Sequence, residues 1–121
     1  MRQIGHFEPL TAASFEAFCG RAPARSVRGY AYVRDGKPLA IFGMERYQDG
    51  WLAFLNRHPD APTGILARRL IVLGLRQITA AMREAKAPIY ADADQRYAGA
   101  CDLLLRMGFA RQSDGRFKWQ A

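Results

Sequence analysis

The sequence has little of several features that would assign it to a common class of protein. Its 121 residues include only two cysteines. Cys19 and Cys101 are far apart and form no CxxC motif, so we expect neither a zinc site nor a disulfide framework, but buried free thiols. The longest apolar candidate, 65–82, is interrupted by three arginines and a glutamine, whereas a membrane helix needs roughly 18 apolar residues in a row. The sequence therefore predicts no membrane partner.

Acidic residues are scarce as well. Asp and Glu together number 11 against 18 Lys and Arg, which gives a formal net charge of +7. Such an excess attracts phosphates, nucleic acid, acidic proteins or a phosphorylated cofactor, and it does not distinguish among them. The first residues also lack the apolar run of a secretory signal, so we expect a cytoplasmic protein.

The composition is that of a folded chain. Half of the residues are apolar and 12% are aromatic, which excludes a disordered or fibrous protein. The length suits one hydrophobic core, and no repeat, low-complexity tract or linker divides the chain. We therefore treat 1–121 as a single domain.

The first half of the chain predicts one helix and four strands. Residues 2–8 alternate weakly and form a short strand, and a helix follows over 12–19, with Thr11 as its N-cap and Gly20 as its end. From residue 28 to residue 56 the apolar period is two, typical of strands. Asp35-Gly36 and Asp49-Gly50 interrupt this pattern, and Asp-Gly is a strong hairpin signal, so three antiparallel strands are expected here.

The second half predicts two helices and three short strands. The long amphipathic helix spans about 65–86, and Gly74 in its middle suggests close packing on the sheet. Its apolar stripe runs through Leu66, Leu70, Leu73, Gln77 and Ala81, flanked by Ile65, Val72, Leu75, Ile78 and Met82. The remaining elements are a strand at 89–91, a helix at 96–107 capped by Gly108, and a last hairpin, 109–111 with 117–119, around Asp114-Gly115. This order of elements predicts an α+β fold with one central sheet.

The order of elements and two local stretches resemble the GNAT superfamily of acetyl-coenzyme-A-dependent N-acetyltransferases. Residues 100–109 read Ala-Cys-Asp-Leu-Leu-Leu-Arg-Met-Gly-Phe, similar to the family's helix-into-strand signature, and Gly64-Ile65 followed by Leu70 fits the turn that opens its cofactor helix. The resemblance covers nearly the whole chain. It implies a GNAT-like domain whose mixed sheet of six to seven strands carries helices on both faces, with 51–56 and 89–91 parallel and splayed.

The resemblance also implies where acetyl-CoA would bind. A helix N-terminus offers unpaired N–H groups to a pyrophosphate, and nearby arginines add charge for a further phosphate. The backbone amides of Leu55 and Asn56 would bind the thioester carbonyl. The complete set of implied cofactor-binding residues is Leu55, Asn56, Arg57, Gly64, Ile65, Leu66, Arg68 and Arg69.

This stretch departs from the family pattern. Of the three fingerprint positions, Ala61, Gly64 and Leu66, only Gly64 matches, and a leucine in place of the second glycine narrows the approach of backbone to phosphate. Gly64 is equally well interpreted as a residue that only starts a helix.

The catalytic residues implied by the family are also incomplete. Leu104 replaces the tyrosine that protonates the departing thiolate, which leaves Tyr97 as the candidate acid or as a packing residue. Glu45 and Asp92, near strand ends, are the candidate general bases, and each is alternatively a solvated acid or an ion-pair partner of an arginine, Arg46 or Arg96. His58 is a further candidate base on a loop. No metal site is expected.

Two functions follow from the resemblance. The first is an acetyl-CoA-dependent N-acetyltransferase acting on an unidentified primary amine. The alternative is a catalytically silent GNAT-fold protein of phage type, acting in the virion or on the host through an acidic protein or virion partner. Small phage-encoded GNAT-like proteins share the abbreviated front end, the strand pair resembling 36–43, and a helix ending Leu-Leu-Arg-Met-Gly-Phe. Nucleic-acid binding is least expected because no recognition motif is present, and either a monomer or a homodimer suits both functions.

Overall fold

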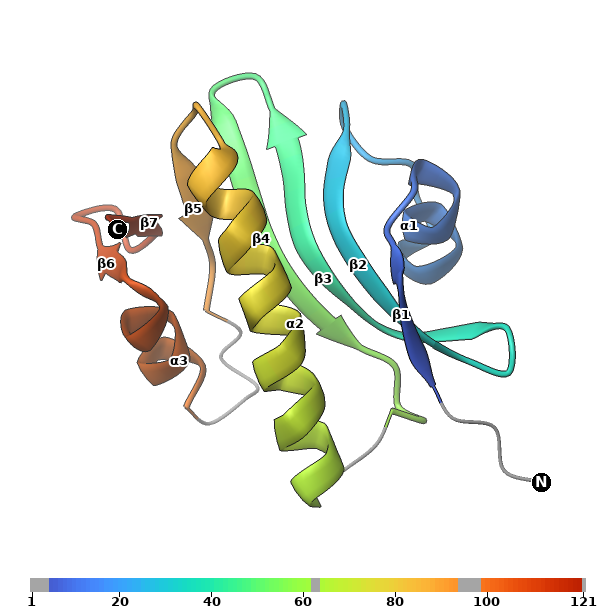
Figure 1. Cartoon of the computed structure of the whole chain (residues 1–121). Coiled ribbons are helices and arrows are strands. Elements are labelled where there is room, and N and C mark those ends of the chain that lie inside the picture. The colour runs from blue at the N-terminus through green and yellow to red at the C-terminus, as the bar shows by residue number, and fades with distance from the viewer. Residues whose placement is uncertain (1–4, 62–63, 94–98, 121) are drawn as a thin grey trace.

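The computed structural model describes residues 5–61, 64–93 and 99–120 (Figure 1). Within these ranges the chain forms one sheet of seven strands and three helices. In chain order they are β1 (His6–Pro9), α1 (Ala12–Cys19), β2 (Val27–Arg34), β3 (Lys37–Tyr47), β4 (Gly50–Arg57), α2 (Gly64–Glu84), β5 (Ile89–Ala91), α3 (Ala100–Met107), β6 (Phe109–Arg111) and β7 (Phe117–Trp119). The α+β prediction is confirmed, and none of these helices is long and apolar enough to cross a bilayer.

The sheet is mixed. Its strand order is β1-β2-β3-β4-β5-β7-β6, and among the described strands β4 and β5 form the parallel pair while the other neighbours are antiparallel. The parallel pairing agrees with the expectation for 51–56 and 89–91. It requires a crossover between the two strands, and α2 makes it.

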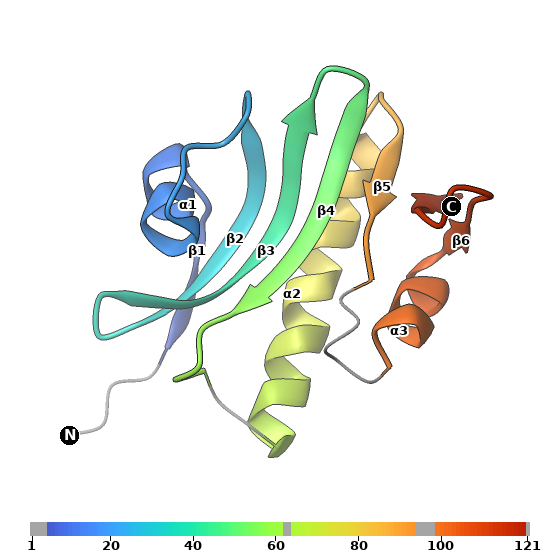
Figure 2. The same ribbon diagram turned by 180° about the vertical axis from the view of Figure 1, so that it is seen from behind.

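The two faces of the sheet carry different helices because side chains alternate along each strand. In β2 and β3, Tyr32, Phe42 and Met44 belong to the core that includes α2, whereas Ala31 and Ile41 belong to a second core under α1. Figures 1 and 2 show α1 and α2 on opposite faces. Helix α1 packs mainly on β2 and β3 and reaches β4 through Phe15, whose ring centre lies 5.7 Å from that of Phe54. Among the described helices none covers β5 on this face (Figure 2).

The first helix and the first hairpin form as the sequence predicts. Thr11 and Ser14 cap α1 reciprocally, each side-chain oxygen accepting the other residue's N–H at 3.1 and 2.9 Å, and Gly20 ends the helix at φ 78°. Asp35 and Gly36 have φ of 54° and 73°, the positive values that a type I′ turn requires.

The second hairpin differs from the prediction. Gln48 and Asp49 form the turn, and Gly50 is already the first residue of β4, paired with Tyr47. The glycine serves a contact between strands instead of a turn, because a Cβ at residue 50 would lie 2.5 Å from the carbonyl oxygen of Pro88 before β5. Asp49-Gly50 therefore correctly predicted a hairpin at this place, but the prediction that Gly50 is a turn residue is wrong.

Helix α2 is rolled relative to the predicted apolar stripe. Its buried residues are Gly74, Ile78 and Met82, while Leu66 and Leu73 are 61% and 45% exposed. The prediction is wrong for Leu66 and Leu73. Leu70 and Ala81 of the stripe and the flanking residues Leu75, Ile78 and Met82 do pack toward the core. Gly74 supplies the reason, since its lack of a side chain allows the helix to approach the ring of Phe42 closely, as its position in the sequence suggested.

The remaining boundaries shift by a few residues. Helix α2 spans 64–84 instead of 65–86, and α3 is described from residue 100, so 96–98 of the predicted helix lie outside the described residues. The last hairpin is confirmed, with Gly115 at φ 89°, and Gly108 ends α3 at φ 101°. Both cysteines are free and partly exposed, not fully buried.

Gly74→Ala tests the contact between α2 and the sheet. An exposed helical glycine gains about 1 kcal/mol on replacement by alanine, but here the added Cβ would lie 2.5 Å from the buried Phe42 ring. Overpacking of a core costs about 1 to 3 kcal/mol. We therefore expect a net loss of stability in urea unfolding, with partial recovery when Phe42→Leu is added. A stabilised single variant would contradict this packing.

Candidate active site

Strands β4 and β5 separate after a short paired segment. Their register includes only Trp51 with Ile89 and Leu52 with Tyr90, and the Trp51 N–H donates to the Pro88 carbonyl at 2.8 Å. Alternate residues of a strand present their backbone groups to the same edge. From residue 53 onward, this edge of β4 therefore has no strand partner among the described residues.

This open edge locates the two predicted backbone donors. Leu55, four residues after Trp51, presents its N–H to the split between β4 and β5. Asn56 faces Ile41 in the register with β3, so its backbone groups are directed to the other edge. The predicted backbone contact to a ligand in the split therefore suits Leu55 and does not suit Asn56. Arg57, also in the predicted set, is exposed at the end of β4.

Helix α2 begins at the end of the sheet where the edge of β4 is open, below the carboxyl end of that strand (Figure 1). Gly64 is its first residue, at φ 67°, and Ile65 and Leu66 are 73% and 61% exposed. Arg68 and Arg69 are exposed too, and with Val72 and Leu73 they line a shallow hollow. None of the salt bridges among the described residues involves these two arginines. The start of α2 thus combines unpaired N–H groups, two cations and exposed apolar side chains.

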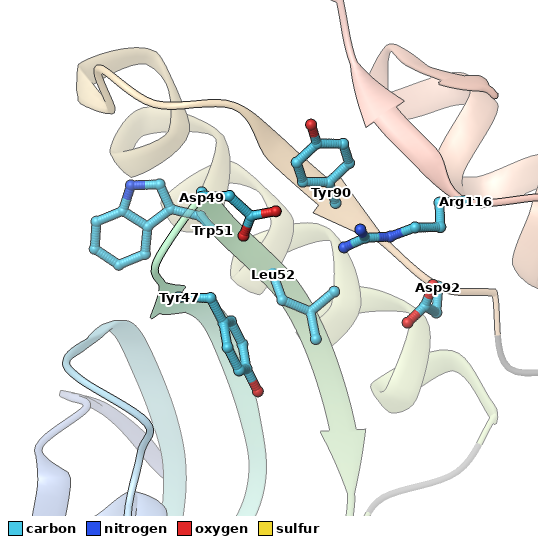
Figure 3. A pocket seen from close by; sticks show the side chains of 8 residues that line it. Tyr47, Asp49, Trp51, Leu52, Tyr90, Asp92 and Arg116 are labelled. Carbon is cyan, nitrogen blue, oxygen red and sulfur yellow. The ribbon is translucent and has the colours of Figure 1, made fainter. Parts of the chain in front are cut away.

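A pocket of about 370 Å³ opens on the face of the sheet that α2 does not cover (Figure 3). Tyr90 lies between Ile89 and Ala91, which both pack toward α2, so Tyr90 points to the opposite face; Leu52 does likewise next to Trp51. Leu52 and Tyr90 are the last pair before the strands separate. The lining residues are Tyr47, Asp49, Gly50, Trp51, Leu52, Tyr90, Asp92 and Arg116.

Glu45 lies beside this pocket in a closed network of hydrogen bonds. Its side chain is 2% exposed. One oxygen accepts hydrogen bonds from Arg21 at 2.9 Å and the Tyr47 hydroxyl at 2.9 Å, and the other accepts from Arg21 at 2.7 Å and the Ala24 N–H at 2.8 Å. The Arg21 hydrogen bonds lower the pKa of Glu45 to about 2, against the opposing effect of burial.

This environment does not suit Glu45 to act as a general base. Both oxygens are occupied, and a carboxylate with a pKa of about 2 accepts a proton poorly at neutral pH. Its partner is Arg21 and not Arg46, which instead stacks over Trp51 at 5.6 Å. Glu45 therefore anchors the segment after α1 to β3. Burial and the hydrogen bond to Glu45 also raise the pKa of Tyr47.

Asp92 is the predicted acidic residue that lines the pocket. It is exposed, directly follows β5, and takes part in none of the salt bridges among the described residues. Tyr97, the candidate acid, lies outside the described residues. Leu104 packs against the core on the α2 side. His58 accepts the Asp60 N–H at 3.0 Å in the loop after β4 and does not line the pocket.

Of the eight residues that line the pocket, only Asp92 was a candidate from the sequence, and the polar residues Tyr47, Asp49 and Arg116 are among those that were missed. Tyr47 precedes the Gln48-Asp49 turn, Asp49 belongs to it, and Arg116 follows the Asp114-Gly115 turn, so each appears in the sequence only as a hairpin residue. Their common location depends on β7 lying next to β5, a pairing between distant segments that no local pattern indicates. Within the described residues no group of three or more His, Cys, Asp or Glu side chains could hold a metal ion.

Comparison of the chain with protein-family models, with curated proteins and with solved structures found no match.

Glu45→Gln tests the anchoring role through the pH dependence of stability. The folded pKa of about 2 is below the ordinary value of 4.5, so the carboxylate stabilises the fold above pH 4.5, and this contribution is lost as the pH falls toward 2. It amounts to about 3 kcal/mol. In urea unfolding at pH 7 we expect the variant to lose about this much, and its stability to change less between pH 5 and pH 2.

Glu16→Gln on the exposed side of α1 is the matched control, because it removes one carboxylate without breaking a salt bridge among the described residues. Equal pH profiles for the Glu45 variant and the parent chain would show that the network contributes nothing to the acid sensitivity.

Proposed function

We propose that this chain is an acetyl-CoA-dependent N-acetyltransferase of the GNAT type that acts on a primary amine. The observation that carries the proposal is the parallel pair β4 and β5, which opens after Leu52 and Tyr90 and leaves a backbone edge of β4 facing the end of the sheet at which α2 begins. This arrangement agrees with the family resemblance of 100–109 and of the turn at Gly64.

The chain has groups suited to an extended, phosphorylated ligand at this split. The Leu55 N–H faces it, and the start of α2 contributes N–H groups together with Arg68 and Arg69, two exposed cations outside any salt bridge among the described residues. The side chain of Leu66 is 61% exposed and so is directed away from the core. Acetyl-CoA, when bound, supplies an acetyl group activated as a thioester.

The amine would enter from the opposite face, where the pocket reaches the split. Its floor, formed by Leu52 and Tyr90, is the last pair of the β4 and β5 ladder, so an amine bound there lies next to the open edge of β4. An amine must be neutral to attack a thioester carbonyl. Asp92, a pocket carboxylate at the end of β5, is the group of this chain that we assign to accept the proton from the ammonium form, directly or through water.

A catalytically silent GNAT-fold protein of phage type remains the second candidate, and a specific surface favours it. Ile65, Leu66, Val72 and Leu73 are between 45% and 73% exposed on α2, next to Arg68 and Arg69. Apolar side chains flanked by cations suit an acidic protein partner, in a virion or in the host cytoplasm. Glu45, held in its network, and Leu104, without a proton to donate, also fit a chain that has lost catalysis.

Titration with acetyl-CoA separates the two functions. Binding to the folded chain must raise its melting temperature once the ligand exceeds its dissociation constant. We expect stabilisation at millimolar acetyl-CoA, and a weaker effect in the double variant Arg68→Ala, Arg69→Ala, because each lost charge-assisted hydrogen bond weakens binding by about 1.5 to 3 kcal/mol. Calorimetry measures the loss directly.

The matched control is Arg76→Ala, Arg83→Ala, which removes the same charge from exposed positions further along the same helix. Equal weakening by both pairs would indicate a general charge effect. Absence of stabilisation in the parent chain would favour the silent, partner-binding function.

Asp92→Asn tests the assigned base. General-base assistance is worth about 10² to 10⁴-fold, so kcat/KM for acetylation of an amine should fall by that factor while the melting temperature and acetyl-CoA affinity stay close to those of the parent. Raising the pH should restore part of the lost rate, because more of the amine is then neutral without help from a base. Asp102→Asn, an exposed acid on α3, is the control. Unchanged kcat/KM at neutral pH would remove Asp92 from the mechanism.

A further inference from the structure

We infer that the pocket of Tyr90, Asp92 and Arg116 binds a small zwitterion, an amine that also carries a carboxylate, with Arg116 holding the carboxylate. The inference rests on the proposed function only in treating the bound amine as the acetyl acceptor. The choice of ligand comes from the charges that line the pocket.

Arg116 is positioned to receive an anion. Its guanidinium lies 4.4 Å from the centre of the Tyr90 ring. The backbone N–H of Arg116 donates to the Asp114 carboxylate at 2.9 Å, which fixes the turn before β7. The residue is partly buried and takes part in none of the salt bridges among the described residues, although Asp49 and Asp92 line the same pocket. A guanidinium stacked on an aromatic ring keeps its edge available, and that edge matches a carboxylate with two parallel hydrogen bonds.

The two carboxylates of the pocket determine the rest of the ligand. Figure 3 shows the side chains of Asp49 and Arg116 directed toward one another above Leu52, with Asp92 on the side of Arg116. A ligand that is only a cation would be repelled by the guanidinium of Arg116. A phosphate with two negative charges would be repelled by both carboxylates. A ligand with one ammonium and one carboxylate satisfies both signs, and Leu52 and Tyr90 offer its hydrocarbon part an apolar floor.

The location connects this ligand with acetyl transfer. Because Leu52 and Tyr90 close the ladder between β4 and β5, a zwitterion with its carboxylate on Arg116 places its amine among Asp49, Asp92 and the open edge of β4. The acceptor would then be an amino-acid-like molecule. An amine without a carboxylate would bind more weakly.

The test is an NMR titration of the full-length ¹⁵N-labelled chain without acetyl-CoA. Three probes of one skeleton are compared: L-leucine, L-leucinamide and 3-methylbutylamine, which carry a carboxylate, a neutral amide and no such group. We expect L-leucine to perturb the amide signals of the pocket residues and to bind at least about tenfold more tightly than the other two. Equal affinities, tighter binding of the amine alone, or no binding of any probe would overturn the inference.

Substitutions identify the residue that is responsible. Arg116→Ala should weaken L-leucine by at least about tenfold and leave 3-methylbutylamine unchanged or bound more tightly, while Arg116→Lys should retain part of the affinity through its charge. Arg111→Ala is the matched control. Arg111 belongs to the same hairpin as Arg116 and likewise stacks on an aromatic ring, that of Phe117 at 5.3 Å, but it does not line the pocket. Loss of L-leucine affinity in both alanine variants would indicate a change in the hairpin and overturn the assignment to Arg116.

A separate acetyl-CoA titration keeps the two proposals apart. Selective L-leucine binding without acetyl-CoA binding would support the zwitterion site and contradict the acetyltransferase. Acetyl-CoA binding with no preference among the three probes would support the acetyltransferase and contradict the zwitterion site.

Discussion

The position of α2 on the sheet depends on one close contact, between Gly74 and the ring of Phe42. Because residue 74 has no side chain, the helix backbone can approach the central strand β3. This approach orients Gly74, Ile78 and Met82 toward the core and leaves Ile65, Leu66, Arg68 and Arg69 exposed at the other end of the helix. The residues of α2 that can contact a ligand or a partner are therefore selected by a packing contact in its middle.

The short ladder between β4 and β5 is the second constraint. Two residue pairs hold the strands together, and beyond them the backbone of β4 is open at one edge. On one side of this split lies the start of a helix with two arginines, and on the other lies a pocket with acids, tyrosines and Arg116. The two sides of the split therefore carry different combinations of charges, and the proposed function assigns a phosphorylated ligand to one side and an amine to the other.

The ion pair of Glu45 and Arg21 has a structural role and does not suit Glu45 to act as a general base. It connects the segment after α1 to β3, and through Tyr47 it also reaches the wall of the pocket. A buried carboxylate with four hydrogen bonds is costly to leave unpaired, so the network favours one conformation of this segment. The acids that remain accessible in the pocket are Asp49, in the turn before β4, and Asp92, at the end of β5.

Local patterns in the sequence were sufficient for most of the fold. The period of two from residue 28 to residue 56, the Asp35-Gly36 turn and the caps at Thr11, Gly20 and Gly108 depend on neighbouring residues, and the structure confirms each of them. The parallel pairing of β4 and β5 was expected through a family resemblance. Gly74 was correctly expected to mark close packing, because a glycine within a helix is destabilising unless something approaches it.

Tertiary structure alone decided the roll of α2, the role of Gly50 and the composition of the pocket. A stripe of leucines does not show which of its edges faces the sheet, and Asp49-Gly50 has the same appearance whether glycine serves a turn or a contact with Pro88. Arg21 and Glu45 are 24 residues apart, and Arg116 meets Tyr90 only because β7 pairs with β5. Secondary-structure propensity depends on residues that are neighbours in the chain. The charged and aromatic side chains of the site are brought together by the pairing of distant strands, so local sequence patterns do not predict the site.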